Sequence, residues 1–152
     1  MTGSRLARPI AHQMQPTPVC CTATCIAMAV GIPVGELGVP LDQAFGLLDF
    51  GVWLADRQVW LRYLDRGERF RPGHLYLLSV RSLNNIGGDH AVLLDTRDCS
   101  CEPPDAGWCQ HWRTLDPNEG IEGKKIYYDV NEYYAIKACE LKDRAGCGAG
   151  IP

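Results

Sequence analysis

One cysteine of this chain lies where the sequence favours a reactive thiol. Cys21 begins the first predicted helix, and a helix N-terminus offers unpaired backbone N–H groups and about half a positive charge. Both features stabilise a thiolate and lower the pKa of a cysteine placed there. The sequence therefore predicts Cys21 as a nucleophile. Its neighbour Cys20 is the alternative nucleophile, and Cys25, one turn further on, is expected in the core.

A nucleophilic thiol needs a base, and His90 is the best placed of the four histidines. It opens a predicted apolar strand over 91–94, which would hold its ring at a strand end. Asp116 ends the next predicted strand, so two adjacent antiparallel strands would bring its carboxylate beside the imidazole and fix the tautomer. Asp89 and Asp95 are alternative carboxylates for this role, and turn chemistry alone would also explain Asp116.

An amide side chain precedes the thiol at a useful distance. Gln15 lies six residues before Cys21, and its amide together with the backbone N–H of Cys21 would provide two donors for a developing oxyanion. Gln13 is the alternative donor, and Gln15 can also be read as an ordinary exposed polar residue. Of the remaining histidines, His74 is expected at a strand start and His12 is expected to be solvated.

A second group of thiols and one histidine lies in the stretch between His90 and Asp116. These residues form a legitimate zinc ligand set, although ligand pairs one residue apart are closer than usual. The set comprises Cys99, Cys101, Cys109 and His111. Disulfides are the second interpretation, pairing Cys99 or Cys101 with Cys109, and Cys139 with Cys147. Free thiols are the third, and apart from this optional zinc no cofactor is expected.

The size and composition of the chain limit its class. Its 152 residues suffice for one domain, 1–152, and 46% hydrophobic with 22% charged residues is near the globular average. No apolar run approaches the roughly 18–20 residues of a membrane-spanning helix. The formal charge of −3 argues against a dedicated nucleic-acid binder. We therefore expect no nucleic acid and no membrane as partner, whereas the thiol with its base is what leads us to expect a protein or peptide substrate.

The N-terminal segment indicates where the protein is made. Arg5 and Arg8 precede Pro9 where the apolar core of a signal peptide should begin, so none is predicted. The simplest interpretation is synthesis in a reducing cytosol, although a bacterial effector exported without a cleaved signal would look the same. The chain could also be one domain of a larger protein. Residues 1–19 carry three prolines and no helical period, which predicts an extended arm.

Helices are predicted in the first half of the chain. The first covers 21–30, with apolar residues at three- and four-residue spacing, and Gly31 ends it. A second is expected over 41–48. A third is predicted behind Asp56 as N-cap, running to Gly67.

Strands are predicted in the second half. Short apolar runs indicate strands over 75–80, 91–94, 112–115 and 126–130, a turn over 84–88, a strand or helix over 133–139, and a frayed tail over 146–152. Helices followed by strands predict an α+β domain, in which a helical half packs against an antiparallel sheet.

The candidate residues, taken in order, resemble the papain-like cysteine peptidases. The closest match is the branch that processes double-glycine bacteriocin leaders, with its stand-alone bacterial relatives. The matching blocks are Gln15–Met28, His90–Leu94 and Asp116-Pro117. Ile26-Ala27-Met28 echoes a Leu-Ala-Met-like stretch of that branch. The chain departs from it in having Thr22 where glycine usually follows the nucleophile, and in a longer stretch between the histidine and the aspartate.

The resemblance implies a papain-like fold and a cysteine protease with catalytic Cys21, His90, Asp116 and Gln15. Deamidases, transglutaminases and peptidoglycan amidases use the same groups and remain alternatives. The resemblance also implies an exported bacterial effector or toxin, with a cognate inhibitor or immunity protein as partner. Two readings of other classes stay open. One is a non-catalytic binding module with the Cys/His zinc site, and the other is a disulfide-stapled secreted protein.

Overall fold

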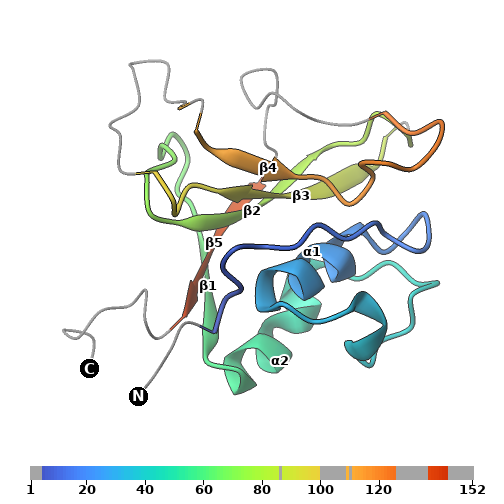
Figure 1. Ribbon diagram of the computed structural model, residues 1–152, viewed down its shortest axis with the longest axis horizontal. Coiled ribbons are helices and arrows are strands. Elements are labelled where there is room, and N and C mark those ends of the chain that lie inside the picture. Colours follow the sequence, from blue (N-terminus) through green and yellow to red (C-terminus); the bar gives the residue numbers. More distant parts are fainter. Residues whose placement is uncertain (1–4, 86, 100–108, 110, 126–136, 144–152) are drawn as a thin grey trace.

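The computed structural model describes residues 5–85, 87–99, 109, 111–125 and 137–143. They form an α+β fold in which a five-stranded antiparallel sheet, ordered β1-β5-β2-β3-β4, carries two short α-helices on one face (Figure 1). The elements are α1 (Cys21–Val30), η1 (Val34–Glu36), η2 (Leu47–Phe50), α2 (Gly51–Asp56), β1 (Val59–Tyr63), β2 (Leu75–Arg81), β3 (Asp89–Asp95), β4 (Arg113–Leu115) and β5 (Lys137–Asp143).

Helix α1 has the predicted bounds, because its residues favour a helix and the glycine that follows ends it. It is rich in alanine, and its residues from Ala23 to Ala29 are all buried. Gly31 ends the helix with φ +77, where its N–H and that of Ile32 bond back to the carbonyls of Met28 and Ala27. A Cβ at Gly31 would lie 3.2 Å from that of Ala7, so both conformation and space favour glycine.

The predicted second and third helices are wrong. Residues 41–43 form a turn, residues 44–46 have no regular structure, and Gly46 is extended before the short helical stretch of η2 and α2. Asp56 therefore ends a helix instead of starting one. Gln58 then takes a left-handed φ of 61, which breaks the helical path.

Residues 59–63, expected to be helical, form strand β1. They pair with β5, from Val59 opposite Asp143 to Tyr63 opposite Cys139. Val59 and Leu61 contact the core while Trp60 is 44% exposed, an alternation of period two. The predicted strands 75–80, 91–94 and 112–115 are confirmed as the cores of β2, β3 and β4, although β4 begins one residue later.

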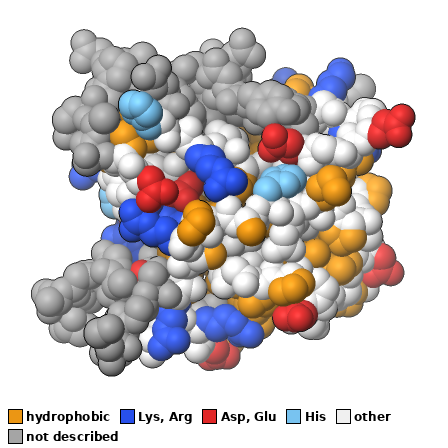
Figure 2. Space-filling model, viewed as in Figure 1, with side chains coloured by type: hydrophobic (Ala, Val, Ile, Leu, Met, Phe, Trp, Pro, Cys, Tyr) orange, Lys and Arg blue, Asp and Glu red, His pale blue; other side chains and the backbone are white. Residues whose placement is uncertain are grey.

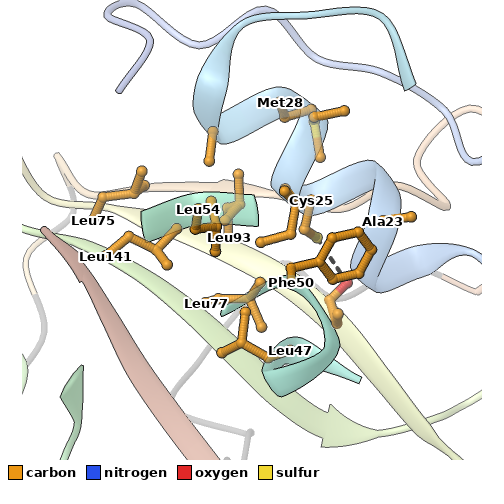
Figure 3. Close-up of a cluster of buried hydrophobic side chains, with 14 of the residues drawn as sticks. Ala23, Cys25, Met28, Leu47, Phe50, Leu54, Leu75, Leu77, Leu93 and Leu141 are labelled. Carbon is orange, nitrogen blue, oxygen red and sulfur yellow. Dashed lines mark hydrogen bonds between the residues drawn. The ribbon is translucent and has the colours of Figure 1, made fainter. Parts of the chain in front are cut away.

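The sheet separates two apolar clusters, because successive side chains of a strand point to opposite faces. Leu75, Leu77 and Leu93 face α1, η2 and α2, and Figure 3 shows them together with Phe50 and Leu54. The second cluster lies on the opposite face and consists of Tyr76, Leu78, Val80, Val92, Leu94, Cys99, Cys109 and Trp112. On the view in Figure 2, apolar side chains collect toward the right and lower right.

The described part of the arm contains bends and turns but no helix or strand, and side chains of the sheet hold it. The N–H groups of Arg5 and Leu6 donate to the buried Asp143 carboxylate at 2.7 and 3.0 Å. Arg113 donates to the carbonyl of Ile10, which is only 2% exposed. The arm is therefore part of the packed domain.

Several predictions concern residues outside the described ranges. These are the strand 126–130, the first part of 133–139, and the tail 146–152. The last part of 133–139, from Lys137, is strand in β5. Among the described helices, none combines the length and the apolar character needed to cross a membrane.

Candidate active site

Cys21 lies at the first position of α1, partly exposed, with its side chain hydrogen-bonded to His90. The N-cap residue Cys20 makes no side-chain capping hydrogen bond. The positive end of the helix dipole therefore acts on Cys21 without a side chain that caps the helix. Burial raises the pKa of the Cys21 thiol, but hydrogen bonds from His90 and the Ala91 backbone, with the imidazolium charge, outweigh it. The net pKa lies below the usual cysteine value.

His90 is the second residue of β3, and its Nε2 lies 2.7 Å from Oδ1 of Asp116. Because Nε2 faces the carboxylate, Nδ1 is the nitrogen left for the thiol. Burial lowers the pKa of His90, but the hydrogen bonds and negative charges of Asp116 and Cys21 raise it to about 9. Both side chains are almost fully buried, at 4% and 1% exposed, so their attraction is weakly screened by water.

Asp116 is positioned by the turn that follows β4. Its Oδ1 also accepts the N–H of Asn118 at 2.8 Å, and its carbonyl accepts the N–H of Glu119 at 2.9 Å. Strand β4 pairs with β3, with Leu115 opposite Leu93, so the prediction that adjacent antiparallel strands join histidine and aspartate is confirmed.

The two cysteines of α1 that are one turn apart both bond to the backbone of Ala91. Its N–H donates to Cys21, and its carbonyl accepts the thiol of Cys25 at 3.4 Å. Cys25 is fully buried, as predicted for a core residue, and burial raises its pKa well above the usual value. It thus fixes α1 against the strand residue next to His90.

Gln15 is placed close to the site from the arm. Its backbone N–H donates to the carbonyl of Pro117 at 2.8 Å, and its Nε2 donates to the carbonyl of Thr17 at 2.8 Å. That bond uses one of the two amide hydrogens. Its Oε1 is buried with no hydrogen-bond partner among the described residues. Gln15 and Cys21 line the same hollow.

The alternative residues are engaged elsewhere. Cys20 is 2% exposed, and its thiol faces the carbonyl of Thr17. Gln13 bonds through both ends of its amide to the turn after α1, at Ile32 and Val34.

The alternative carboxylates are also occupied or distant. Asp95 is at the far end of β3 and pairs with Arg97 at 2.9 Å, whereas Asp89 is exposed. Neither therefore replaces Asp116 as the partner of His90.

Two hollows meet at the Cys21–His90 pair. One, of about 520 Å³, extends along Phe45, Leu48 and Tyr63. The other, of about 430 Å³, extends along Gln15, Asn118 and Lys124. Leu48 is 73% exposed and Tyr63 39%, so apolar surface lies open beside the thiol. A chain-like ligand would therefore find space on both sides of the Cys21 sulfur.

The sequence reasoning missed one residue of the site. His12, expected to be solvated, is half-buried, and its Nε2 lies 2.6 Å from the carbonyl oxygen of Asp116. Nothing in the local sequence pattern links His12 to a residue over a hundred positions away.

His74 precedes β2 as expected, with its Nδ1 against the buried Glu140.

The second thiol group is partly assembled, away from the Cys21 site. Sγ of Cys109 lies 3.4 Å from Sγ of Cys99 and 3.4 Å from Nδ1 of His111. Cys101 and Cys147 lie outside the described residues. The thiols of Cys99, Cys109 and Cys139 are all free and buried, so the disulfide between Cys99 and Cys109 is not formed in this structure.

Comparison with known proteins gives no relative: no family model, no curated protein and no solved structure matches the chain.

Proposed function

We propose that the chain is a cysteine-dependent amide hydrolase of the papain-like type, most simply a peptidase. The observation that carries the proposal is the hydrogen-bonded series from Cys21 through His90 to Asp116 at the N-terminus of α1. Opposite shifts of pKa, down for the thiol and up to about 9 for the imidazole, favour a thiolate–imidazolium pair.

The proposed reaction is acyl transfer. The Cys21 thiolate attacks an amide carbonyl, and the oxyanion receives hydrogen bonds from the Cys21 N–H and the Gln15 amide. His90 gives its proton to the leaving amine as the carbon–nitrogen bond breaks. It then takes a proton from water, which attacks the thioester, releases the acid and returns the sulfur as thiolate. Asp116 holds the imidazole orientation throughout.

The two hollows favour a peptide over an isolated side-chain amide. A scissile peptide bond at Cys21 has chain on both sides, and hollows extend from Cys21 toward Leu48 on one side and toward Lys124 on the other. A deamidated side chain would need room on only one side. The exposed apolar residues along the larger hollow suit apolar side chains of the substrate.

The test is a digest of a mixture of unfolded proteins, read by mass spectrometry of new N-termini and by release of ammonia. We expect new N-termini with wild type and none with Cys21→Ser. Cys20→Ser, which changes the adjacent buried thiol, is the matched control and should keep activity.

Ammonia release without new N-termini would replace the peptidase by a deamidase with the same groups. No Cys21-dependent product of either kind, with Cys21 alkylated no faster than free glutathione, would refute the amide hydrolase.

A further inference from the structure

Three soft donor groups converge between β3 and β4, on the opposite side of the sheet from α1. They are the thiols of Cys99 and Cys109 and the imidazole of His111, and their donor atoms all lie within 4.8 Å of one another. The thiols belong to the second apolar cluster, against Tyr76 and Trp112, whereas His111 is exposed. None of these three residues lines either hollow at Cys21.

The distances between the donors suit a tetrahedral ion. Ligands at about 2.3 Å for sulfur and 2.0–2.1 Å for nitrogen lie roughly 3.5–3.8 Å from one another around zinc. The Cys99–Cys109 and Cys109–His111 separations are both 3.4 Å, and the Cys99–His111 separation is at most 4.8 Å, so modest side-chain shifts would bring all three donors to the tetrahedral spacing. The three groups leave one position for water or a further donor.

The backbone also supports a metal-bound thiolate at Cys109. The N–H of His111 is directed at its Sγ, 3.5 Å away, and hydrogen bonds to ligand atoms orient and tune metal sites. Turns position the two thiols. The N–H of Cys99 donates to the carbonyl of Thr96, and the N–H of Trp112 donates to the carbonyl of Cys109.

We propose that Cys99, Cys109 and His111 bind a zinc ion, which ties these three residues together beside the second apolar cluster. A disulfide explains the arrangement less well. The two sulfurs lie 3.4 Å apart where a disulfide requires about 2.05 Å, and a disulfide gives the adjacent imidazole no role. The zinc site does not depend on the proposed peptidase activity.

The experiment measures zinc in the full chain after incubation with zinc chloride and dialysis against metal-free buffer, together with affinity in competition with a chromophoric chelator. We expect about one zinc per chain in wild type, and at least roughly tenfold weaker binding in Cys109→Ser and His111→Ala. His111 is exposed, so its variant should fold normally.

Two control variants separate this site from other thiols. Cys139→Ser alters another buried free cysteine, and Cys21→Ser removes the thiol that contacts His90. Both should keep about one zinc per chain. Cobalt(II) in place of zinc should give a thiolate charge-transfer band in wild type that His111→Ala perturbs.

Three results would each overturn the proposal. They are wild type that retains no zinc, zinc retained with unchanged affinity in both Cys109→Ser and His111→Ala, and loss of the metal in Cys21→Ser alone. Recovery of Cys99 and Cys109 as one disulfide-linked peptide pair from unreduced, zinc-treated protein would also overturn it. Because alkylation of Cys21 is measured separately, failure here would leave the proposed hydrolase standing.

Discussion

Replacement of Asp116 by asparagine should weaken thiolate formation at Cys21 without disturbing the fold. Asparagine has nearly the same shape, and its Oδ1 can still accept the N–H of Asn118, which lies 2.8 Å from the carboxylate oxygen. It has no negative charge to hold the imidazolium of His90, whose Nε2 is 2.7 Å away. Asp116 is only 1% exposed, so solvent screens this charge little.

The size of the effect follows from that one contact. A hydrogen bond to a charged group contributes about 1.5–3 kcal/mol, which corresponds to roughly 10- to 100-fold in the thiolate–imidazolium equilibrium. In wild type the pKa of His90 is raised to about 9, and without Asp116 burial of the ring pushes it down. We therefore expect alkylation of Cys21 at about pH 6 to slow by ~10–100-fold. The rate should recover at high pH, where the thiol ionises without help.

The assay is the rate of iodoacetamide alkylation of Cys21 from pH 5 to 10, read by peptide mass spectrometry, with circular dichroism to check folding. Asp89→Asn is the matched control, because it makes the same charge change at an exposed residue next to His90. It should change the rate by less than about twofold. A wild-type profile in Asp116→Asn, or equal slowing by Asp89→Asn, would refute the assigned role of Asp116.

Three further outcomes follow from the contacts. Gln15→Ala should lower kcat of peptide hydrolysis by about 100-fold with little change in KM, and a kcat within about twofold would exclude an oxyanion role. Cys25→Ala removes a fully buried thiol bonded to the Ala91 carbonyl, so the free energy of unfolding measured in urea should fall by about 1–2 kcal/mol. An unchanged urea midpoint would mean that this contact adds no stability. In a Cys21→Ser background, where only Asp116 still raises the pKa of His90, the stability from that shift should be present below pH 6.5 and decline as the pH rises above it, so thermal melts that are flat up to pH 9 would contradict the assigned charge state.

The local sequence predicted a secondary-structure element correctly where it determined both the type of the element and which of its residues are buried. The alanine-rich run before Gly31 predicts α1, because small residues pack closely and glycine accepts the left-handed turn. The apolar runs of β2 and β3 predict strands covered on both faces, as the two clusters show. The order of Cys21, His90 and Asp116 along these elements was enough to predict which side chains meet.

The sequence failed where distant pairing decides the structure. The segment 59–63 fits helical spacing at Val59, Trp60 and Tyr63 and also fits period two at Val59, Leu61 and Tyr63. The choice is made by β5, about 80 positions later. A single-sequence pattern contains no information on that partner. The same holds for His12, whose contact with Asp116 exists only because the arm folds back along β4.

The site depends on both faces of the sheet through β4. Helix α1 positions Cys21 from one face, while Cys99, Cys109 and Trp112 pack on the other, and Asp116 follows directly at the end of β4. Arg113 in β4 holds the arm at Ile10, and the arm returns His12 to the carbonyl of Asp116. A change at Cys99, Cys109 or Trp112 should therefore affect the Asp116 carboxylate before it affects the Cys21 thiol. It would lower the fraction of His90 that is protonated and slow the alkylation of Cys21 at neutral pH, while Cys21 itself stayed in place on α1.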